Sequence, residues 1–286
     1  MSLKVSLKAA AKEAIVRAAS VLPGDASSTR CLMYHSVVQT EMQDDLQLTV
    51  SSDLVRRQFG YLRDNGYAVT DAAALVSAIR AGREPRARSV VLTFDDGYVD
   101  NRDVALPLLA EFGYRATLFV TADALTGRGR PEANRDYLTA AQARDMLTSG
   151  LISFGCHSAS HRNLRGLGEA ELAHETAGAK AQIEDALGVG VTLFAYPFGS
   201  YDAWDDRVRA AVQRAGYDGA FTSIVGPNTA RRDPYLLFRS RISWAEEIPS
   251  FSRLLTGGYD WYARVQWLHA RGGRSRRRVN AEGGTS

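Results

Sequence analysis

The feature that most constrains the fold of this chain is an alternation of short apolar runs with longer amphipathic stretches. Eight runs have the length and composition of strands, and most are separated by a stretch whose apolar spacing predicts a helix. The expected strands cover residues 31–35, 67–70, 89–94, 115–121, 151–156, 191–196, 217–223 and 237–243. No internal sequence repeat accompanies the alternation. This pattern favours a parallel sheet, either a barrel or a doubly wound open sheet.

The expected helices begin and end at ordinary capping and breaking residues. They cover residues 3–22, 52–65, 71–81, 102–112, 140–148, 169–187, 204–215, 246–255 and 260–269. Pro107 predicts a kink or a first helical turn, because proline lacks the N–H of the helix interior. Residues 36–50 and 122–138 are expected to be loops. We expect an N-terminal helix and linker over 1–29, one α/β domain over 30–270, and a basic disordered tail over 271–286.

The charge of the chain is concentrated at its end. The net charge is +3 over 286 residues, but the last sixteen hold five arginines and one glutamate, which leaves −1 for the remainder. The body of the protein is therefore not expected to bind nucleic acid. Cys31 and Cys156 both lie in apolar runs, and two such cysteines do not indicate a disulfide framework.

No apolar run is long enough to span a bilayer. Charged residues interrupt any apolar segment near the N-terminus, so a signal peptide is not indicated and a cytoplasmic location is expected. Lys4, Lys8 and Lys12 form a basic row on the expected first helix. This row indicates either a solvated face or, together with the basic tail, a peripheral contact with a membrane surface.

One expected strand, residues 89–94, ends in two adjacent carboxylates, Asp95 and Asp96. Aspartate is depleted in strands, and an unpaired buried charge is costly. Two neighbouring carboxylates also repel each other, so they need a cation or a shared proton. Gly97 then allows a sharp turn of the backbone. The alternative is an ordinary strand followed by an Asp-Gly turn.

Two histidines follow another expected strand, residues 151–156. His157 and His161 are four residues apart, so their rings lie on one face of a helix or can converge in a loop. A carboxylate and two imidazoles form a three-ligand metal site with positions left for water and substrate. Ser158 and Ser160 are expected to satisfy the loop backbone rather than act as nucleophiles, because no Gly-x-Ser-x-Gly motif accompanies them.

The ordered motifs Thr93-Phe94-Asp95-Asp96-Gly97-Tyr98, His157-Ser158-Ala159-Ser160-His161 and Ala195-Tyr196-Pro197-Phe198-Gly199 resemble those of the polysaccharide deacetylases, carbohydrate esterase family 4. The resemblance covers roughly residues 30 to 245. The stretch from Met33 to Val37 is similar to that of the poly-N-acetylglucosamine deacetylase branch. The resemblance implies a distorted (β/α) barrel of seven or eight parallel strands, with the active site at their carboxyl ends.

The resemblance also implies roles for individual residues. Asp96, His157 and His161 would hold a divalent metal, most plausibly zinc, although cobalt, nickel or iron also suits this ligand set. Asp95 would be the general base. Tyr196 and Pro197 would line the sugar groove, and the backbone N–H of Tyr196 would bind the oxyanion.

Two departures from the family pattern leave alternatives open. Ala195 stands where many members have an arginine that orients the base, and Arg241 or Arg239 is expected to take that role. The usual late Leu-x-His motif is not evident, although His269 follows a leucine. His35, at the end of the first expected strand, is the preferred general acid because histidine titrates near neutral pH.

The expected function is metal-dependent removal of N-acetyl groups from amino sugars of a polysaccharide or a glycan precursor. A first alternative is a catalytically weak carbohydrate-binding relative, which the two departures would favour. A second alternative is another carbon–nitrogen hydrolase of the superfamily that acts on a small amide. Intact Asp95 and Asp96 argue against the weak relative.

Overall fold

The structure is a computed structural model that describes residues 28–40, 44, 47–129 and 135–270. Its main sheet is parallel and has the strand order β10-β1-β5-β6-β7-β8-β9, with β4 paired to the first residues of β5. The strands are β1 (Arg30–Tyr34), β4 (Ala68–Thr70), β5 (Ser89–Asp96), β6 (Ala116–Val120), β7 (Ile152–Cys156), β8 (Leu193–Ala195), β9 (Gly219–Phe221) and β10 (Ser240–Arg241).

The sheet closes on itself through residues 237–241. Leu237 forms a parallel bridge with Phe221 of β9, and β10 pairs with Leu32 and Met33 of β1. The described strands therefore form a distorted parallel barrel, which confirms the predicted (β/α) architecture with seven or eight strands.

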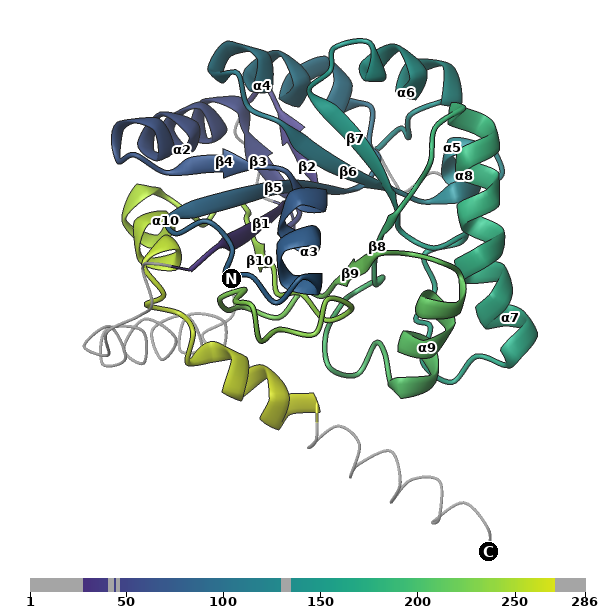
Figure 1. Ribbon diagram of the computed structural model, residues 1–286. Coiled ribbons are helices and arrows are strands. Elements are labelled where there is room, and N and C mark those ends of the chain that lie inside the picture. Colours follow the sequence, from purple (N-terminus) through teal and green to yellow (C-terminus); the bar gives the residue numbers. More distant parts are fainter. Residues whose placement is uncertain (1–27, 41–43, 45–46, 130–134, 271–286) are drawn as a thin grey trace, which may run out of the picture.

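Helices surround this ring of strands, as Figure 1 shows. They are α2 (Ser52–Asp64), α3 (Ala72–Arg80), α4 (Leu106–Phe112), α5 (Ala122–Leu125), α6 (Ala140–Leu147), α7 (Glu169–Ala173), α8 (Ala179–Leu187), α9 (Asp206–Arg214) and α10 (Ile248–Leu255). Two π-helical turns, η1 (Asn101–Ala105) and η2 (His174–Gly178), lead into α4 and join α7 to α8. Residues 262–270 are also helical.

Pro107 lies in the first turn of α4, which is one of the two places predicted for it. The side chains of Ser51 and Asp71 cap α2 and α3. Other predictions are wrong. The expected loop over 36–50 contains β2 (Ser36–Val38) and β3 (Thr49–Ser51), which form a small parallel sheet. The last expected strand shortens to β10 and one bridge. The expected helix over 3–22 and the tail over 271–286 lie outside the described residues.

Side-chain alternation along β5 divides its residues between two packing layers. Val90, Leu92 and Phe94 belong to the larger hydrophobic cluster between the barrel and its helices, whereas Val91 belongs to the smaller cluster inside the barrel. The inner cluster contains Cys31, Ala72, Leu75, Val76, Ile79, Val91, Phe119, Leu193, Ala195, Phe221 and Leu237. Helix α3 lies across the middle of the ring in the view of Figure 1, and its apolar side chains pack in this interior. The same alternation directs Asp95 into the barrel.

One glycine is required by the packing of the barrel interior. A Cβ atom on Gly155 of β7 would lie 2.4 Å from the Phe119 ring, which is closer than side-chain atoms pack. Phe119 is completely buried and packs against Phe221 with the two rings tilted, their centroids 5.5 Å apart. The absence of a side chain at Gly155 therefore makes room for an aromatic pair beneath the carboxyl ends of the strands.

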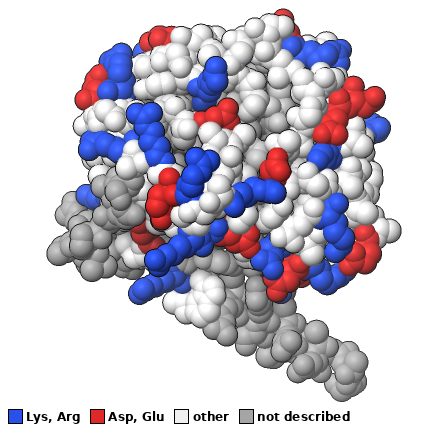
Figure 2. All heavy atoms as spheres, viewed as in Figure 1, with Lys and Arg blue, Asp and Glu red and all other residues white. Residues whose placement is uncertain are grey.

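The surface carries charges of both signs. Figure 2 shows acidic and basic side chains interspersed over the viewed face of the described residues. Ion pairs such as Arg80–Asp218 and Arg209–Asp233 neutralise part of this charge. Within the described part of the chain, no helix has the length and apolar character needed to cross a bilayer.

Candidate active site

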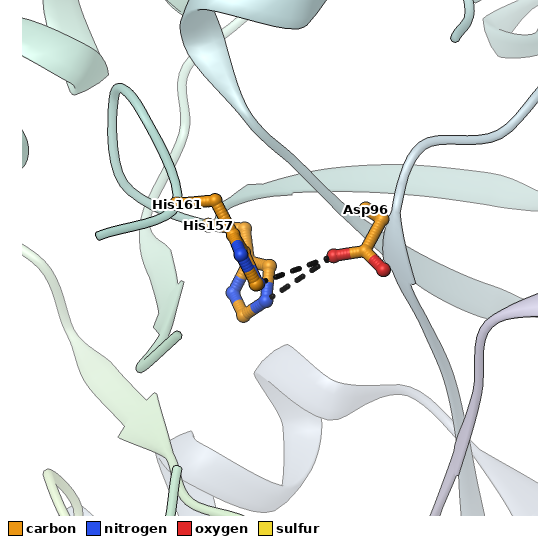
Figure 3. A group of neighbouring side chains, drawn as sticks. All are labelled: Asp96, His157 and His161. Atoms are coloured by element: carbon orange, nitrogen blue, oxygen red, sulfur yellow. Dashed lines mark ion pairs between the residues drawn. The ribbon is translucent and has the colours of Figure 1, made fainter. Parts of the chain in front are cut away.

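Asp96, His157 and His161 converge at the carboxyl ends of β5 and β7, as Figure 3 shows. The Oδ1 atom of Asp96 lies 3.6 Å from Nε2 of His157 and 3.4 Å from Nε2 of His161. One ligand atom from each residue lies within 4.8 Å of the other two, and no other such cluster occurs among the described residues. The structure thus brings together the three residues that the sequence nominated as metal ligands.

The orientation and charge of His157 fit a metal ligand. Its Nδ1 lies 2.8 Å from the carbonyl oxygen of Ala195, so Nδ1–H donates to that oxygen and Nε2 keeps its lone pair toward Asp96. Burial lowers the pKa of His157 to about 4, so the imidazole is neutral at pH 7. Neutral imidazole is the form that binds metal, so the donor set fits a divalent ion.

The histidine loop, residues 157–161, is anchored by hydrogen bonds to Glu175 in η2. Its Oε2 accepts the backbone N–H groups of Ala159 and Ser160 at 3.0 Å, and its Oε1 accepts the Ser160 hydroxyl. The Oγ of Ser158 accepts the N–H of His161 at 3.0 Å. Ser158 therefore satisfies the loop backbone, as expected, whereas the Ser160 hydroxyl binds the Glu175 carboxylate instead. The sequence did not reveal Glu175, because a glutamate in a helical stretch has no local signal of burial.

Four residues around the site have left-handed backbone conformations: Asp96, Ser158, His161 and Phe198, with φ angles of 73°, 66°, 57° and 63°. Such conformations cost about 1–3 kcal/mol each for residues other than glycine, and they cluster at functional sites. At Asp96 the turn redirects the last carboxylate of β5 toward the histidines, although strand alternation alone would point it outward.

Asp95 lies inside the barrel and forms a bidentate ion pair with Arg239. The Nη1–Oδ1 and Nη2–Oδ2 distances are 2.6 and 2.8 Å, and both residues are almost completely buried. Burial alone would raise the pKa of Asp95, but the Arg239 guanidinium and His157 outweigh it and lower the pKa to about 2. Asp95 is therefore ionised at neutral pH, in the form that accepts a proton.

Of the two arginines that the sequence offered as partners of Asp95, Arg239 forms the pair and Arg241 does not. Arg241 is exposed at the rim, and its Nη2 lies 3.4 Å from Oε1 of Gln47. The reason is depth in the barrel. Arg241 pairs with Met33 of β1 in the sheet. The backbone of Arg239 lies two residues earlier in the same segment and so deeper in the barrel, and its long side chain ends beside Asp95.

His35 and His269 occupy very different surroundings. His35 lines the same cavity as the metal-ligand candidates, is only 8% exposed, and its Nδ1 has no hydrogen-bond partner. Asn101 in η1 donates to the carbonyl oxygen of His35 at 2.6 Å and so holds the end of β1. His269 is exposed on the helix over 262–270 and does not line the cavity. The geometry favours His35 as the acid, which stays a prediction.

The third motif differs from expectation in detail. The N–H of Tyr196 donates to the carbonyl oxygen of Phe221 at 3.0 Å, so that amide is already used within the barrel. Pro197 is buried and does not line the cavity. Tyr196 and Phe198 do line it; Phe198 is 59% exposed, and its ring centroid lies 5.0 Å from that of His161. The Phe198 N–H has no acceptor among the described residues.

These residues surround one cavity of about 640 Å³ at the carboxyl ends of the strands. A candidate site for a divalent ion stands beside a buried, ionised carboxylate, with a histidine on the same wall. A parallel barrel with this arrangement defines the class of metal-assisted hydrolases, in which an ion and a carboxylate base act together on water.

Comparison with known proteins shows which family the chain resembles. Residues 82–220 match the family model of the polysaccharide deacetylases. The chain is 28% identical over 228 residues to the polysaccharide deacetylase YxkH of Bacillus subtilis, which covers 80% of this chain and 74% of the relative. The resemblance to the polysaccharide deacetylases, whose members remove N-acetyl groups from polysaccharides, is thereby confirmed over residues 82–220.

Two further comparisons agree with this result. The chain is 30% identical over 135 residues to the poly-beta-1,6-N-acetyl-D-glucosamine N-deacetylase of Escherichia coli, which covers 44% of this chain and 20% of that protein. The Streptococcus pyogenes deacetylase PplD, solved in complex with acetate, superimposes with a TM-score of 0.70 at 25% identity. That match covers 82% of this chain and 99% of PplD.

Proposed function

We propose that this chain removes N-acetyl groups from amino sugars within a polysaccharide, with Asp95 as general base and His35 as general acid. The observation that carries the proposal is the meeting of two sites in one cavity. The Asp96–His157–His161 cluster and the Asp95–Arg239 ion pair both lie at the carboxyl ends of the strands. The first can hold a cation, and the second keeps a base ionised beside it.

Asp96, His157 and His161 would hold the ion, for which zinc suits the donor set best and cobalt, nickel or iron also suits it. When bound, a divalent ion supplies Lewis acidity that polarises the acetyl carbonyl and lowers the pKa of water. Arg239 orients the Asp95 carboxylate, which accepts the proton of the attacking water. The Phe198 N–H is available to donate to the carbonyl oxygen as negative charge develops there. His35 protonates the leaving amine, and the products are acetate and a free amino sugar.

The structure weakens the case for a catalytically weak relative. That alternative relied on the replacement of an arginine by Ala195 and on the missing late histidine. Arg239 supplies the guanidinium partner of Asp95 from a different segment, and His35 lines the cavity directly after β1. Both departures from the family pattern therefore have a residue in the cavity that can do the same work.

Acetate release tests the proposal directly. The substrates would be β-1,6-linked and β-1,4-linked oligomers of N-acetylglucosamine, with a panel of small linear and cyclic amides beside them. We expect release from at least one oligomer, loss of release with a chelator, and its return with zinc. Release from small amides alone would support the carbon–nitrogen hydrolase alternative.

The ligand assignment has its own test. Replacement of Asp96, His157 or His161 by alanine is expected to lower metal affinity more than the 10–100-fold typical of supporting residues. His174→Ala is the matched control, because His174 is exposed on η2 and lies outside the cavity. Full metal occupancy in all three variants would refute the assignment.

A further inference from the structure

The segment from Gly257 to Gln266 contributes a wall of the catalytic cavity. This segment follows α10 and lies beyond the end of the family match at residue 220. Tyr259, Trp261 and Tyr262 line the cavity that also holds Asp96 and the histidines. Three aromatic side chains from a region outside the matched part of the chain therefore line the same cavity as the candidate metal ligands.

Specific contacts hold this segment in place. Asp260 forms a bidentate ion pair with Arg30, which is 1% exposed at the start of β1, at 2.5 and 3.0 Å. The side chain of Gln266 accepts the N–H of Val225 and donates to the carbonyl oxygen of Ser223, both at 3.0 Å. A partly buried ion pair and a two-way amide contact fix the segment to β1 and to the loop that follows β9.

The same contacts connect the segment to the metal-ligand side of the cavity. The Ser223 hydroxyl donates to the carbonyl oxygen of Phe198 at 2.6 Å, and the Ser223 N–H donates to Gly199 at 2.9 Å. Phe198 in turn packs on the ring of His161. Gln266 therefore contacts Ser223, and Ser223 in turn contacts the loop that carries the exposed Phe198 ring.

Core packing does not account for two of the three aromatic residues. Tyr259 packs on the larger hydrophobic cluster, whereas Trp261 and Tyr262 belong to neither cluster and remain partly exposed. Their rings meet edge to face, with centroids 5.8 Å apart and an interplanar angle of 84°. The indole N–H of Trp261 donates to the carbonyl oxygen of Gly258 at 3.0 Å, which fixes the ring.

We propose that Trp261 and Tyr262 form a subsite for the sugar unit next to the one that loses its acetyl group. A pyranose ring has an apolar C–H face and a polar rim, and a fixed aromatic ring binds such a face through apolar contact while the rim stays hydrated. The inference rests on the proposed function and extends it to the recognition of a polymer.

The size of the cavity supports an extended substrate. Pockets of roughly 300–1,000 Å³ hold drug-sized ligands, which are larger than a single amino sugar. The cavity of about 640 Å³ therefore leaves room beyond the acetylated unit that reaches the metal-ligand cluster. Polar side chains also line the cavity, among them Gln47, Arg241 and Glu246.

The test compares substrates of different length. Trp261→Ala and Tyr262→Ala are assayed on N-acetylglucosamine and on its β-linked pentamer, with Trp261→Phe as the conservative variant. We expect KM for the pentamer to rise about tenfold in the alanine variants, on the scale of one aromatic contact. We expect kcat to stay near wild type, no change on the monosaccharide, and substantial rescue by phenylalanine. Leu268→Ala is the matched control, because Leu268 is 59% exposed and lies outside the cavity.

The outcomes separate the two proposals. If the wild type releases acetate and the alanine variants have the same KM for the pentamer as the wild type, the subsite is refuted while the proposed function stands. If the wild type releases no acetate from any amino sugar, the proposed function fails. The pentamer is then titrated calorimetrically into wild type and Trp261→Ala. Tighter binding by the wild type supports the subsite, and equal affinity refutes it.

Discussion

In protein from which metal has been removed with a chelator, Asp95→Asn is expected to lower the free energy of unfolding by about 3–5 kcal/mol. This is the usual cost of removing one partner of a buried ion pair. The substitution leaves the guanidinium of Arg239 buried at 1% exposure with no opposite charge. Arg239 would keep weaker contacts, with Thr222 at 3.1 Å and Thr93 at 3.2 Å. Arg239→Gln is expected to cost a similar amount, because it leaves the Asp95 carboxylate alone in the same interior.

The pKa of Asp95 reflects all of its surroundings, in which burial opposes the charged form while Arg239 and His157 favour it. Its pKa is about 2 in the folded chain, against an ordinary value of 3.8. The unfolded chain therefore takes up this proton first as the pH falls, and folding stability rises with pH between about 2 and 4. The shift corresponds to about 2 kcal/mol. This is smaller than the cost of the substitution, because it is a net value that already contains the burial penalty.

A double-mutant cycle measures the coupling. Asp95→Asn, Arg239→Gln and the double variant are unfolded with urea after chelation, and circular dichroism reports the free energy of unfolding. We expect the double variant to cost at least about 2 kcal/mol less than the sum of the single variants. Arg80→Gln is the control, because its pair with Asp218 is exposed and worth less than about 1 kcal/mol. Additive single costs, or an Asp95→Asn cost below about 1 kcal/mol, would refute the reasoning.

Three further predictions concern the groups around the cavity. His35→Ala should keep metal and fold but slow amide hydrolysis about 10²–10⁴-fold, with activated esters much less affected; normal amide turnover alongside inactive His269→Ala would reverse the assignment. Glu175→Gln should weaken the anchor of the histidine loop and lower zinc affinity about 10–100-fold in a competition titration, and an unchanged affinity would contradict that role. Gly155→Ala should lower the free energy of unfolding by about 1–3 kcal/mol, because its methyl group overlaps the ring of Phe119; a variant as stable as wild type in urea would contradict this overlap.

The local sequence was sufficient to predict the strand and the adjacent carboxylates on which the site is built. The long apolar run of β5 and the two carboxylates at its end follow from strand propensity and from residues adjacent in the chain. The cap of α2 at Ser51 and that of α3 at Asp71 are likewise interactions over two or three residues. Since parallel strands bring their carboxyl ends together, the convergence of Asp96 with the two histidines could be expected once the sheet was inferred.

Only the tertiary structure decided which residues support those groups. Arg239 lies 144 residues from Asp95, and its choice over Arg241 depends on how deep each begins in the barrel. Glu175 reaches the histidine loop from a π-helical turn. Trp261 lines the cavity from a segment that is held by the ion pair between Asp260 and Arg30, which are 230 residues apart in the sequence. These contacts depend on strand register and on the closure of the sheet, and neither is encoded by the spacing of neighbouring residues.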